Sequence, residues 1–204
     1  MAGPRYPGLI WRGKKVGVQA GQDTKTLYRV LLAKAGLSSK DIVEIPVKYD
    51  FSQFLNGSVD VWPGYAATQS YILSQKGIPY DIISPSDSGV KYVGTVYFTT
   101  ERTIKEHPEW VRAFTKSLIE GWHITYSDES KAIADVSSFD PKSLTPDLVR
   151  WNLEKQRRSI QPEGREYCEF QLSDFEAMQQ ILVDQHLLAS RIDLPKAIST
   201  EFLK

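Results

Sequence analysis

Two short segments of this 204-residue chain place polar or aromatic side chains at points that a ligand can reach. The first follows a predicted strand over 14–19 and leads into a predicted helix, with Gln19, Gly21, Gln22 and Asp23 around the turn. A helix N-terminus presents unpaired N–H groups and a partial positive charge, which suit an anion or a polar ligand edge. Gly21 would let the backbone approach closely. The alternative is an ordinary turn, because neither a Walker A loop nor the three-glycine dinucleotide motif is present.

The second segment, 60–65, sets Trp62 and Tyr65 on either side of a Pro-Gly turn at the end of another predicted strand. Ligands of open α/β sheets bind beyond the carboxyl ends of the strands. Aromatic rings at that edge can stack on a flat heterocycle or hold a cation. The alternative is structural: Trp62 packs in the core, and Tyr65 only opens the next helix.

The residue types that usually carry catalysis form no recognisable site. The three histidines lie far apart in the sequence: His107, His123 and His186. None belongs to a metal-spaced pair, so we expect structural or surface roles for them. Cys168 is the only cysteine, which excludes an intrachain disulfide and a cysteine-built zinc site, and the nearby Glu166 and Glu169 should raise its pKa. We therefore predict no catalytic residue, no metal site and no cofactor.

The charge balance argues against a nucleic-acid partner. Lysine plus arginine (25) equals aspartate plus glutamate (25), so no overall positive charge attracts phosphates. One predicted helix carries four basic residues that mix with Glu154 and indicate a solvated face: Arg150, Lys155, Arg157 and Arg158. No apolar run approaches the roughly 20 residues that span a bilayer. Residues 1–8 lack the apolar stretch of a signal peptide.

The order of the predicted elements indicates an α/β fold. Residues 1–13 are rich in Gly, Pro and Arg and predict a linker. Over 14–90, strands predicted at 14–19, 42–47, 58–62 and 80–84 alternate with helices, which is typical of βαβ units on a mainly parallel sheet.

Residues 91–204 follow a different pattern. The stretch 92–99 is rich in β-forming residues, and helices are predicted from residue 108 and over 128–136, 145–160, 173–188 and 195–203. Apolar helix faces need a surface to cover, and this tail has no further sheet of its own. We expect the covering sheet to precede residue 1, and the uncovered surface to promote self-association.

Several segments, taken in order, resemble SsuA-like solute-binding proteins of ABC importers. The nearest branch is the NMT1/THI5-like one, which binds thiamine pyrimidine precursors. The segments that carry the resemblance are 13–18 (Gly-Lys-Lys-Val-Gly-Val), 54–65 with its Pro63-Gly64-Tyr65, 84–89, 98–101, 108–114 and Gly121-Trp122. The resemblance runs from about residue 10 to the C-terminus. It implies a type II periplasmic-binding-protein fold that lacks most of its N-terminal lobe: 14–90 form the second lobe, and 91–204 supply a crossing strand and helices that return to the first.

The same resemblance implies a function. The chain would be the substrate-binding component of an ABC importer, periplasmic or lipoprotein in its parent, with a small solute and permease subunits as partners. It would make and break no bonds, and its lobes would close by a hinge near 92–95. The implied ligand-binding set is Gln19, Gly21, Gln22, Asp23, Trp62, Tyr65 and Gln69.

Two departures leave the ligand open. Thr68-Gln69-Ser70 replaces the branch's Asn-Glu-Pro, so an amide that both donates and accepts stands where a glutamate is usual. Ser88 replaces a stacking tyrosine. One alternative function is a ligand-sensing domain of a signalling protein. Another is a pyrimidine-synthesis enzyme, which loses support because the cysteine-rich motif of the related fungal synthases is absent.

Overall fold

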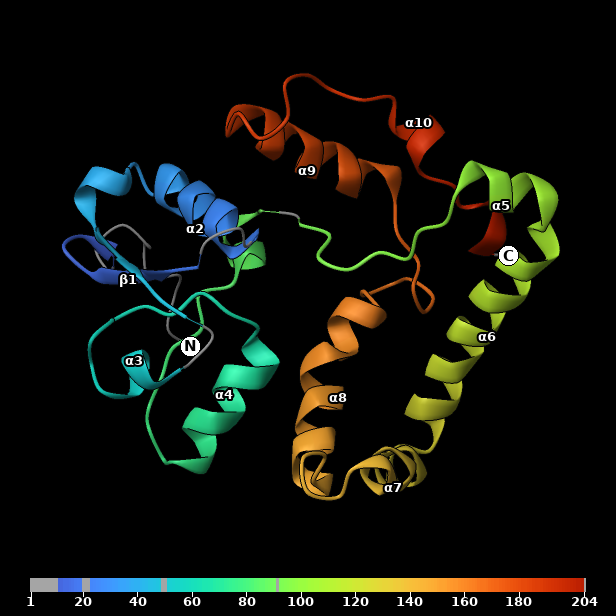
Figure 1. Ribbon diagram of the computed structural model, residues 1–204, viewed down its shortest axis with the longest axis horizontal. Helices are drawn as coiled ribbons and strands as arrows, with labels where there is room; N and C mark the ends of the chain where they lie inside the picture. The colour runs from blue at the N-terminus through green and yellow to red at the C-terminus, as the bar shows by residue number, and fades with distance from the viewer. Residues whose placement is uncertain (1–10, 20–22, 49–50, 91, 204) are drawn as a thin grey trace.

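The computed structural model describes residues 11–19, 23–48, 51–90 and 92–203 (Figure 1). Strands β1 (Lys15–Val18) and β2 (Val43–Pro46) are parallel, with Val16 opposite Glu44. Helix α2 (Asp23–Lys34) and the short helix η1 (Ser39–Asp41) connect them. β1 is buried at its last three residues, as expected for a parallel strand covered on both faces. The first two predicted strands are therefore confirmed.

The third predicted strand is shorter than expected, and the fourth is wrong. Val61 makes a single parallel bridge to Val16, and the Gly17 N–H donates to the Val61 carbonyl oxygen at 2.9 Å. β1 thus lies between β2 and Val61. Residues 80–84 are irregular. Pro79 and Pro85 flank this stretch and have no N–H to give to a ladder, so no strand pairs with it among the described residues.

The core of this α/β unit lies between the sheet and α2. Its most buried side chains are Trp11 (2% exposed), Val16 (0%) and Leu32 (1%). Trp11 lies inside the stretch predicted to be a linker. Two further helices, α3 (Ser52–Leu55) and α4 (Ala66–Gln75), and the short helix η2 (Pro85–Ser88) complete the unit.

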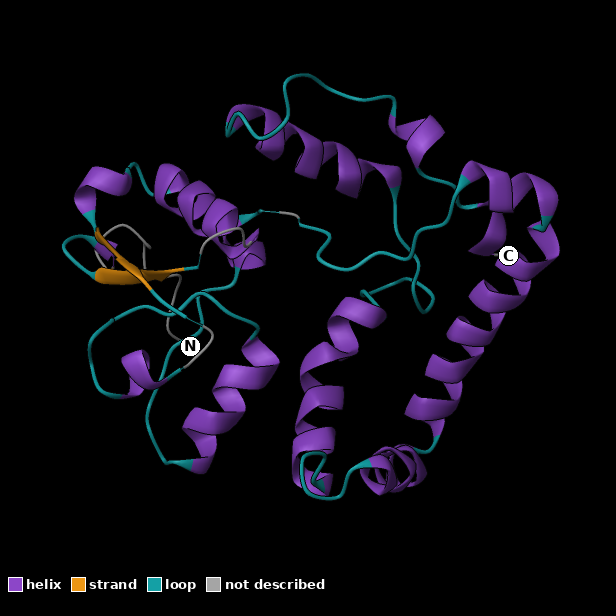
Figure 2. Cartoon of the chain, in the orientation of Figure 1, coloured by secondary structure: helices purple, strands orange, loops and turns teal. Residues whose placement is uncertain are grey.

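Residues 92–203 contain no strand among those described (Figure 2). The stretch 92–99 has no regular structure and joins no ladder, although its composition predicts a strand. The helices that follow confirm most of the sequence prediction: α5 (Glu101–Glu106), α6 (Pro108–Ser127), α7 (Glu129–Phe139), α8 (Pro146–Ile160) and α9 (Leu172–Asp184). The last predicted helix, 195–203, is reduced to α10 (Leu194–Ala197) and η3 (Glu201–Leu203), with extended backbone at Ile198 between them.

Capping side chains explain where two of these helices begin. The Asp128 carboxylate accepts from the Lys131 N–H at 3.0 Å at the start of α7, and Thr145 caps α8 with Pro146 in the first position. In Figure 1, α6, α7 and α8 form three sides of an open frame, with α8 beside α4. Ile181 of α9 packs against the core of the α/β unit. The tail therefore meets the α/β unit through α8 and α9.

Candidate functional site

The candidate site lies where three parallel segments end. Because β1, β2 and the Val61 bridge run the same way, their carboxyl ends meet at one edge of the sheet. Just beyond β1, the side-chain amide of Gln19 donates to the Lys48 carbonyl oxygen at 3.3 Å. Trp62 follows directly after Val61. Gln19 and Trp62, two residues of the predicted ligand set, therefore lie at the same edge of the sheet, and their part in binding stays a prediction.

A tight turn at Gly64 brings Trp62 and Gln69 together. A Cβ added at Gly64 would lie 2.7 Å from Oε1 of Gln69 and 3.2 Å from Cδ1 of Trp62. Any side chain at residue 64 would therefore displace the amide of Gln69. Beneath the turn, a Cβ on Gly17 would lie 3.5 Å from Cδ of Pro63, an ordinary van der Waals distance. Glycine at residue 64 lets an indole and an amide flank the same point.

Two polar atoms at this turn have no hydrogen-bond partner among the described groups. They are the indole N–H of Trp62 and Oε1 of Gln69, and both atoms are buried. Leaving a buried donor or acceptor unpaired costs about 1–3 kcal/mol. The indole N–H of Trp62 can only donate a hydrogen bond, whereas Oε1 of Gln69 can only accept one. A ligand edge that carries an acceptor beside a donor would satisfy both.

Aromatic rings border this pair. The ring of Phe51 meets that of Trp62 edge to face, with centroids 5.2 Å apart and planes 82° apart. Tyr65 directly precedes α4, and 71% of its surface is exposed. An exposed aromatic ring of this kind can stack on a flat ligand. Trp62, by contrast, is half-buried and packs on Phe51, whereas its predicted binding role stays a prediction.

The remaining predicted ligand residues lie in the turn after β1. Gly21 and Gln22 fall outside the described residues. Asp23 is the first residue of α2. The role in ligand binding that the sequence predicts for this turn therefore stays a prediction.

Sequence analysis missed one contact that reaches the site from the tail. The indole N–H of Trp151, on α8, donates to the Ser70 hydroxyl at 3.2 Å. Ser70 directly follows Gln69 on α4 and is only 3% exposed. The only signal in the sequence was a tryptophan among charged residues on a helix predicted to be solvated. Lys155, one of those residues, in fact lies over the Trp151 ring, with Nζ 4.6 Å from the centroid.

The residues set aside as non-catalytic are not brought to this turn. His107 stacks on Trp110 at 3.8 Å and pairs with Glu109, whereas His123 meets the ring of Tyr167. Burial raises the pKa of the Cys168 thiol. The direction predicted for that pKa is confirmed, but its cause is burial rather than the neighbouring glutamates.

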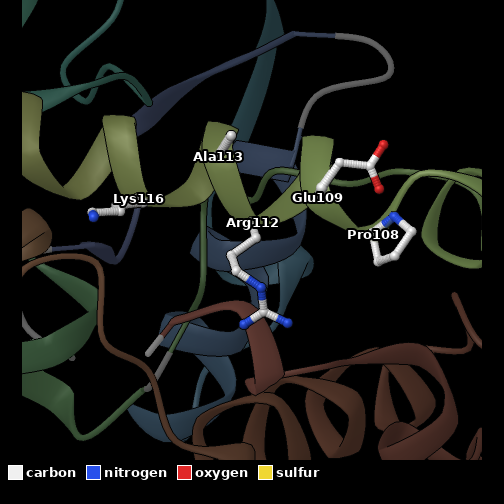
Figure 3. A pocket seen from close by; sticks show the side chains of 5 residues that line it. All are labelled: Pro108, Glu109, Arg112, Ala113 and Lys116. Carbon is white, nitrogen blue, oxygen red and sulfur yellow. The ribbon is translucent and has the colours of Figure 1, made fainter.

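One hollow of the surface lies away from this turn, on α6. It measures about 410 Å³ and is lined by residues of that helix alone: Pro108, Glu109, Arg112, Ala113 and Lys116 (Figure 3). The guanidinium of Arg112 lies 5.5 Å from the ring centroid of Phe202. One helix supplies every lining residue, so the hollow is a shallow depression rather than an enclosed pocket.

Neither a metal cluster nor a membrane span is found in the described parts of the chain. No group of three or more His, Cys, Asp or Glu residues gathers there in a way that could hold a metal ion. None of the helices described is both long and apolar enough to cross a bilayer.

Comparison with known proteins gives a consistent result. Residues 11–132 match the family model described as NMT1/THI5 like. The aliphatic sulphonate binding protein SsuA from Escherichia coli, which is periplasmic, has a similar structure, with a TM-score of 0.71 at 18% identity. The alkanesulfonate-binding protein SsuA from Xanthomonas axonopodis pv. citri, solved bound to MOPS, gives 0.70 at 19%. No curated protein sequence matches significantly.

The share of each chain that these alignments cover shows how much of the fold is present. The alignments cover 97% of this chain but only 62% and 66% of the two SsuA chains. At such identities the likeness shows the fold, so the predicted α/β periplasmic-binding-protein fold, present in part, is confirmed.

Proposed function

Because the chain belongs to the NMT1/THI5-like family, we propose that it binds a small polar or heterocyclic solute and delivers it to the permease subunits of an ABC importer. It makes and breaks no bonds and needs no cofactor. The thiamine pyrimidine precursors are the ligand class we propose first. The full protein would act in the periplasm or as a cell-surface lipoprotein.

One observation carries the ligand class. The turn at Gly64 holds an indole N–H and an amide oxygen, both buried and unpaired, and the next residue, Tyr65, is exposed. An aminopyrimidine presents a ring nitrogen acceptor next to an amino donor on a flat ring, which complements all three groups. A sulfonate has acceptors only, so it would be satisfied only with the Gln69 amide turned to present its N–H₂ group. With the amide oxygen oriented as described, the turn favours the heterocycle over the sulfonates bound by the SsuA proteins.

The other predicted residues complete the proposal. Gln19 is fixed to Lys48 at the same edge of the sheet. The backbone amides around Gly21, Gln22 and Asp23 would meet the opposite edge of the ligand, as a helix N-terminus can. The crossing segment near 92–95 would act as the hinge.

An NMR titration tests the ligand class directly. The ¹⁵N-labelled chain is titrated with 4-amino-5-hydroxymethyl-2-methylpyrimidine and, separately, with MOPS, while the indole resonance of Trp62 is followed. We expect the pyrimidine to move that resonance and MOPS to leave it in place. Affinity should be modest, because the described elements border the turn from one side only.

Matched variants make the test specific. Gln69→Leu should weaken the pyrimidine about tenfold, since it removes one buried hydrogen bond. The same substitution at Gln75, the exposed last residue of α4, should leave affinity unchanged. Binding of MOPS without binding of the pyrimidine would overturn the proposed ligand class.

A further inference from the structure

The first turn of α4 faces two parts of the molecule at once. Tyr65 and Gln69 are four residues apart and belong to the candidate site. Ala66 and Ser70 are also four residues apart, on the adjacent face of the helix, and they meet α8 through Ser70. A shift of Ser70 would therefore also move Gln69, because the two residues are neighbours in the same turn of α4.

The hydroxyl of Ser70 joins this turn to α8. It donates to the Ala66 carbonyl oxygen one turn earlier and accepts from the Trp151 indole N–H. The direction is fixed because an indole nitrogen only donates. A serine that bonds back to the preceding turn bends its helix locally. The two bonds together set the position of the turn from Tyr65 to Ser70.

Trp151 is itself held in place from other directions. Its ring meets that of Tyr71 at 5.9 Å with an angle of 65°, and Lys155 lies over it. Only the bond to Ser70 connects the Trp151 N–H to the first turn of α4. The ring contacts and the hydrogen bond can therefore be removed separately.

We propose that Trp151 is a positioning residue for the candidate site: through Ser70 it sets the first turn of α4 and so the place of the Gln69 amide beside Trp62. The proposal rests on the proposed function for its meaning, since the site it tunes is the ligand site. It makes the tail part of the binding machinery, because α8 meets the helix that carries Gln69 through the bond from Trp151 to Ser70. A displacement of α8 relative to the α/β unit would move the Gln69 amide through this hydrogen bond and so change the ligand preference.

The first arm of the test needs no ligand. Indole resonances are compared among the wild-type chain, Ser70→Ala, Trp151→Phe and Lys155→Gln. Trp151→Phe keeps an aromatic ring but loses the N–H together with one ring of the indole, so Ser70→Ala, which removes the same hydrogen bond from its other partner, is the matched check. We expect Ser70→Ala and Trp151→Phe to move the Trp62 resonance, whereas Lys155→Gln, which contacts the same ring without touching α4, moves only that of Trp151. An unmoved Trp62 resonance in both variants would overturn the proposal.

The second arm measures ligand preference. Titrations compare 4-aminopyrimidine with unsubstituted pyrimidine, which offers the turn no amino donor for Gln69. We expect Trp151→Phe to reduce the preference for 4-aminopyrimidine about three- to tenfold, as for other coupled neighbours. The double variant with Ser70→Ala should lose no more than the single one. An equal loss for the two probes would show a merely structural role and overturn the proposal. If the Trp62 resonance moves but the wild-type chain binds neither probe, the coupling stands and the proposed ligand class fails.

Discussion

The α/β unit of this chain has a densely buried core, whereas the helical tail buries some apolar side chains, such as Ile133 and Phe175, and leaves other large ones exposed. In the α/β unit, Trp11, Val16 and Leu32 are at most 2% exposed. In the tail, the 20-residue helix α6 buries no residue at all, and Phe98 and Phe139 are 93% and 87% exposed. Both regions contain helices, but the helices of the α/β unit have a sheet to cover, whereas the described tail has no strand. An amphipathic helix without a layer beneath it leaves its apolar face in water.

The comparison with the SsuA structures suggests a reason for this difference in burial. The chain spans about two-thirds of the SsuA chains it matches. We propose that residues 14–90 form one lobe, and that 91–204 contribute a crossing segment and helices to another lobe. The tail nevertheless contacts the α/β unit: Ile181 packs against its core, and Trp151 donates a hydrogen bond to Ser70.

The largest expected effect is on the mass of the chain in solution. Exposed apolar patches promote association, so we expect sedimentation velocity to show dimers or larger species. Phe98→Lys should shift the distribution towards monomer. Val43→Lys, at a half-exposed position on β2 in the α/β unit, serves as the control and should not. A clean monomer at all concentrations would contradict the idea that the tail lacks a covering surface.

The next effect compares burial in the two regions directly. Leu32→Ala should lower the free energy of unfolding by about 2–5 kcal/mol, because it leaves a cavity in the core. Phe114→Ala on α6, where the side chain is 55% exposed, should cost about 0.5 kcal/mol or less. Urea denaturation followed by circular dichroism measures each change. Similar losses from the two variants would mean that the tail has a core of its own in solution.

Ligand binding should depend on the α/β unit far more than on exposed aromatics of the tail. Trp62→Ala should weaken binding by about 1–3 kcal/mol if the indole stacks on the ligand and donates to it. Trp110→Ala, which removes an exposed indole of α6, should leave affinity unchanged. Calorimetry on a full-length homologue carrying the 54–69 segment gives the two values. Unchanged affinity in a folded Trp62→Ala protein would remove this residue from the site.

What could be predicted from the sequence depended on how local each signal is. β1, β2 and the long helices follow from periodicity within a few turns of chain, and so they were predicted nearly in full. The strand predicted at 58–62 is reduced to the bridge at Val61, and the one at 80–84 is absent, because a strand exists only where a neighbour pairs with it and composition does not reveal the neighbour.

The site shows the same limit. The aromatic turn at 62–65 was visible as a motif, because its residues are adjacent in sequence. The meeting of Trp62 with Gln69 depends on the backbone turn at Gly64. The bond from Trp151 to Ser70 joins residues 81 apart, and no local pattern announces it.

The smallest expected effect concerns a contact inside the α/β unit. Tyr28, 4% exposed on α2, donates to the Glu44 carboxylate on β2, which Arg29 also meets at 3.0 Å. Burial, and next the hydrogen bond to Glu44, raise the pKa of Tyr28 from 10.0 to about 12. The folded state therefore prefers the protonated phenol. Its contribution to stability is complete below pH 10, the unfolded value, and is lost as the pH rises through about 12.

Tyr28→Phe separates this contribution from the titration of the lysines. At neutral pH we expect the variant to lose about 1 kcal/mol, the usual net value of one hydrogen bond. Between pH 10 and 12 the wild-type chain should lose stability more steeply than the variant, so the two unfolding free energies converge. Tyr97→Phe, at an exposed tyrosine before α5, is the matched control and should follow the wild type throughout. If the gap between wild type and Tyr28→Phe stays constant across this range, the Tyr28 hydroxyl is not protected by the core, and the tight packing ascribed to the α/β unit does not extend to the contact between α2 and β2.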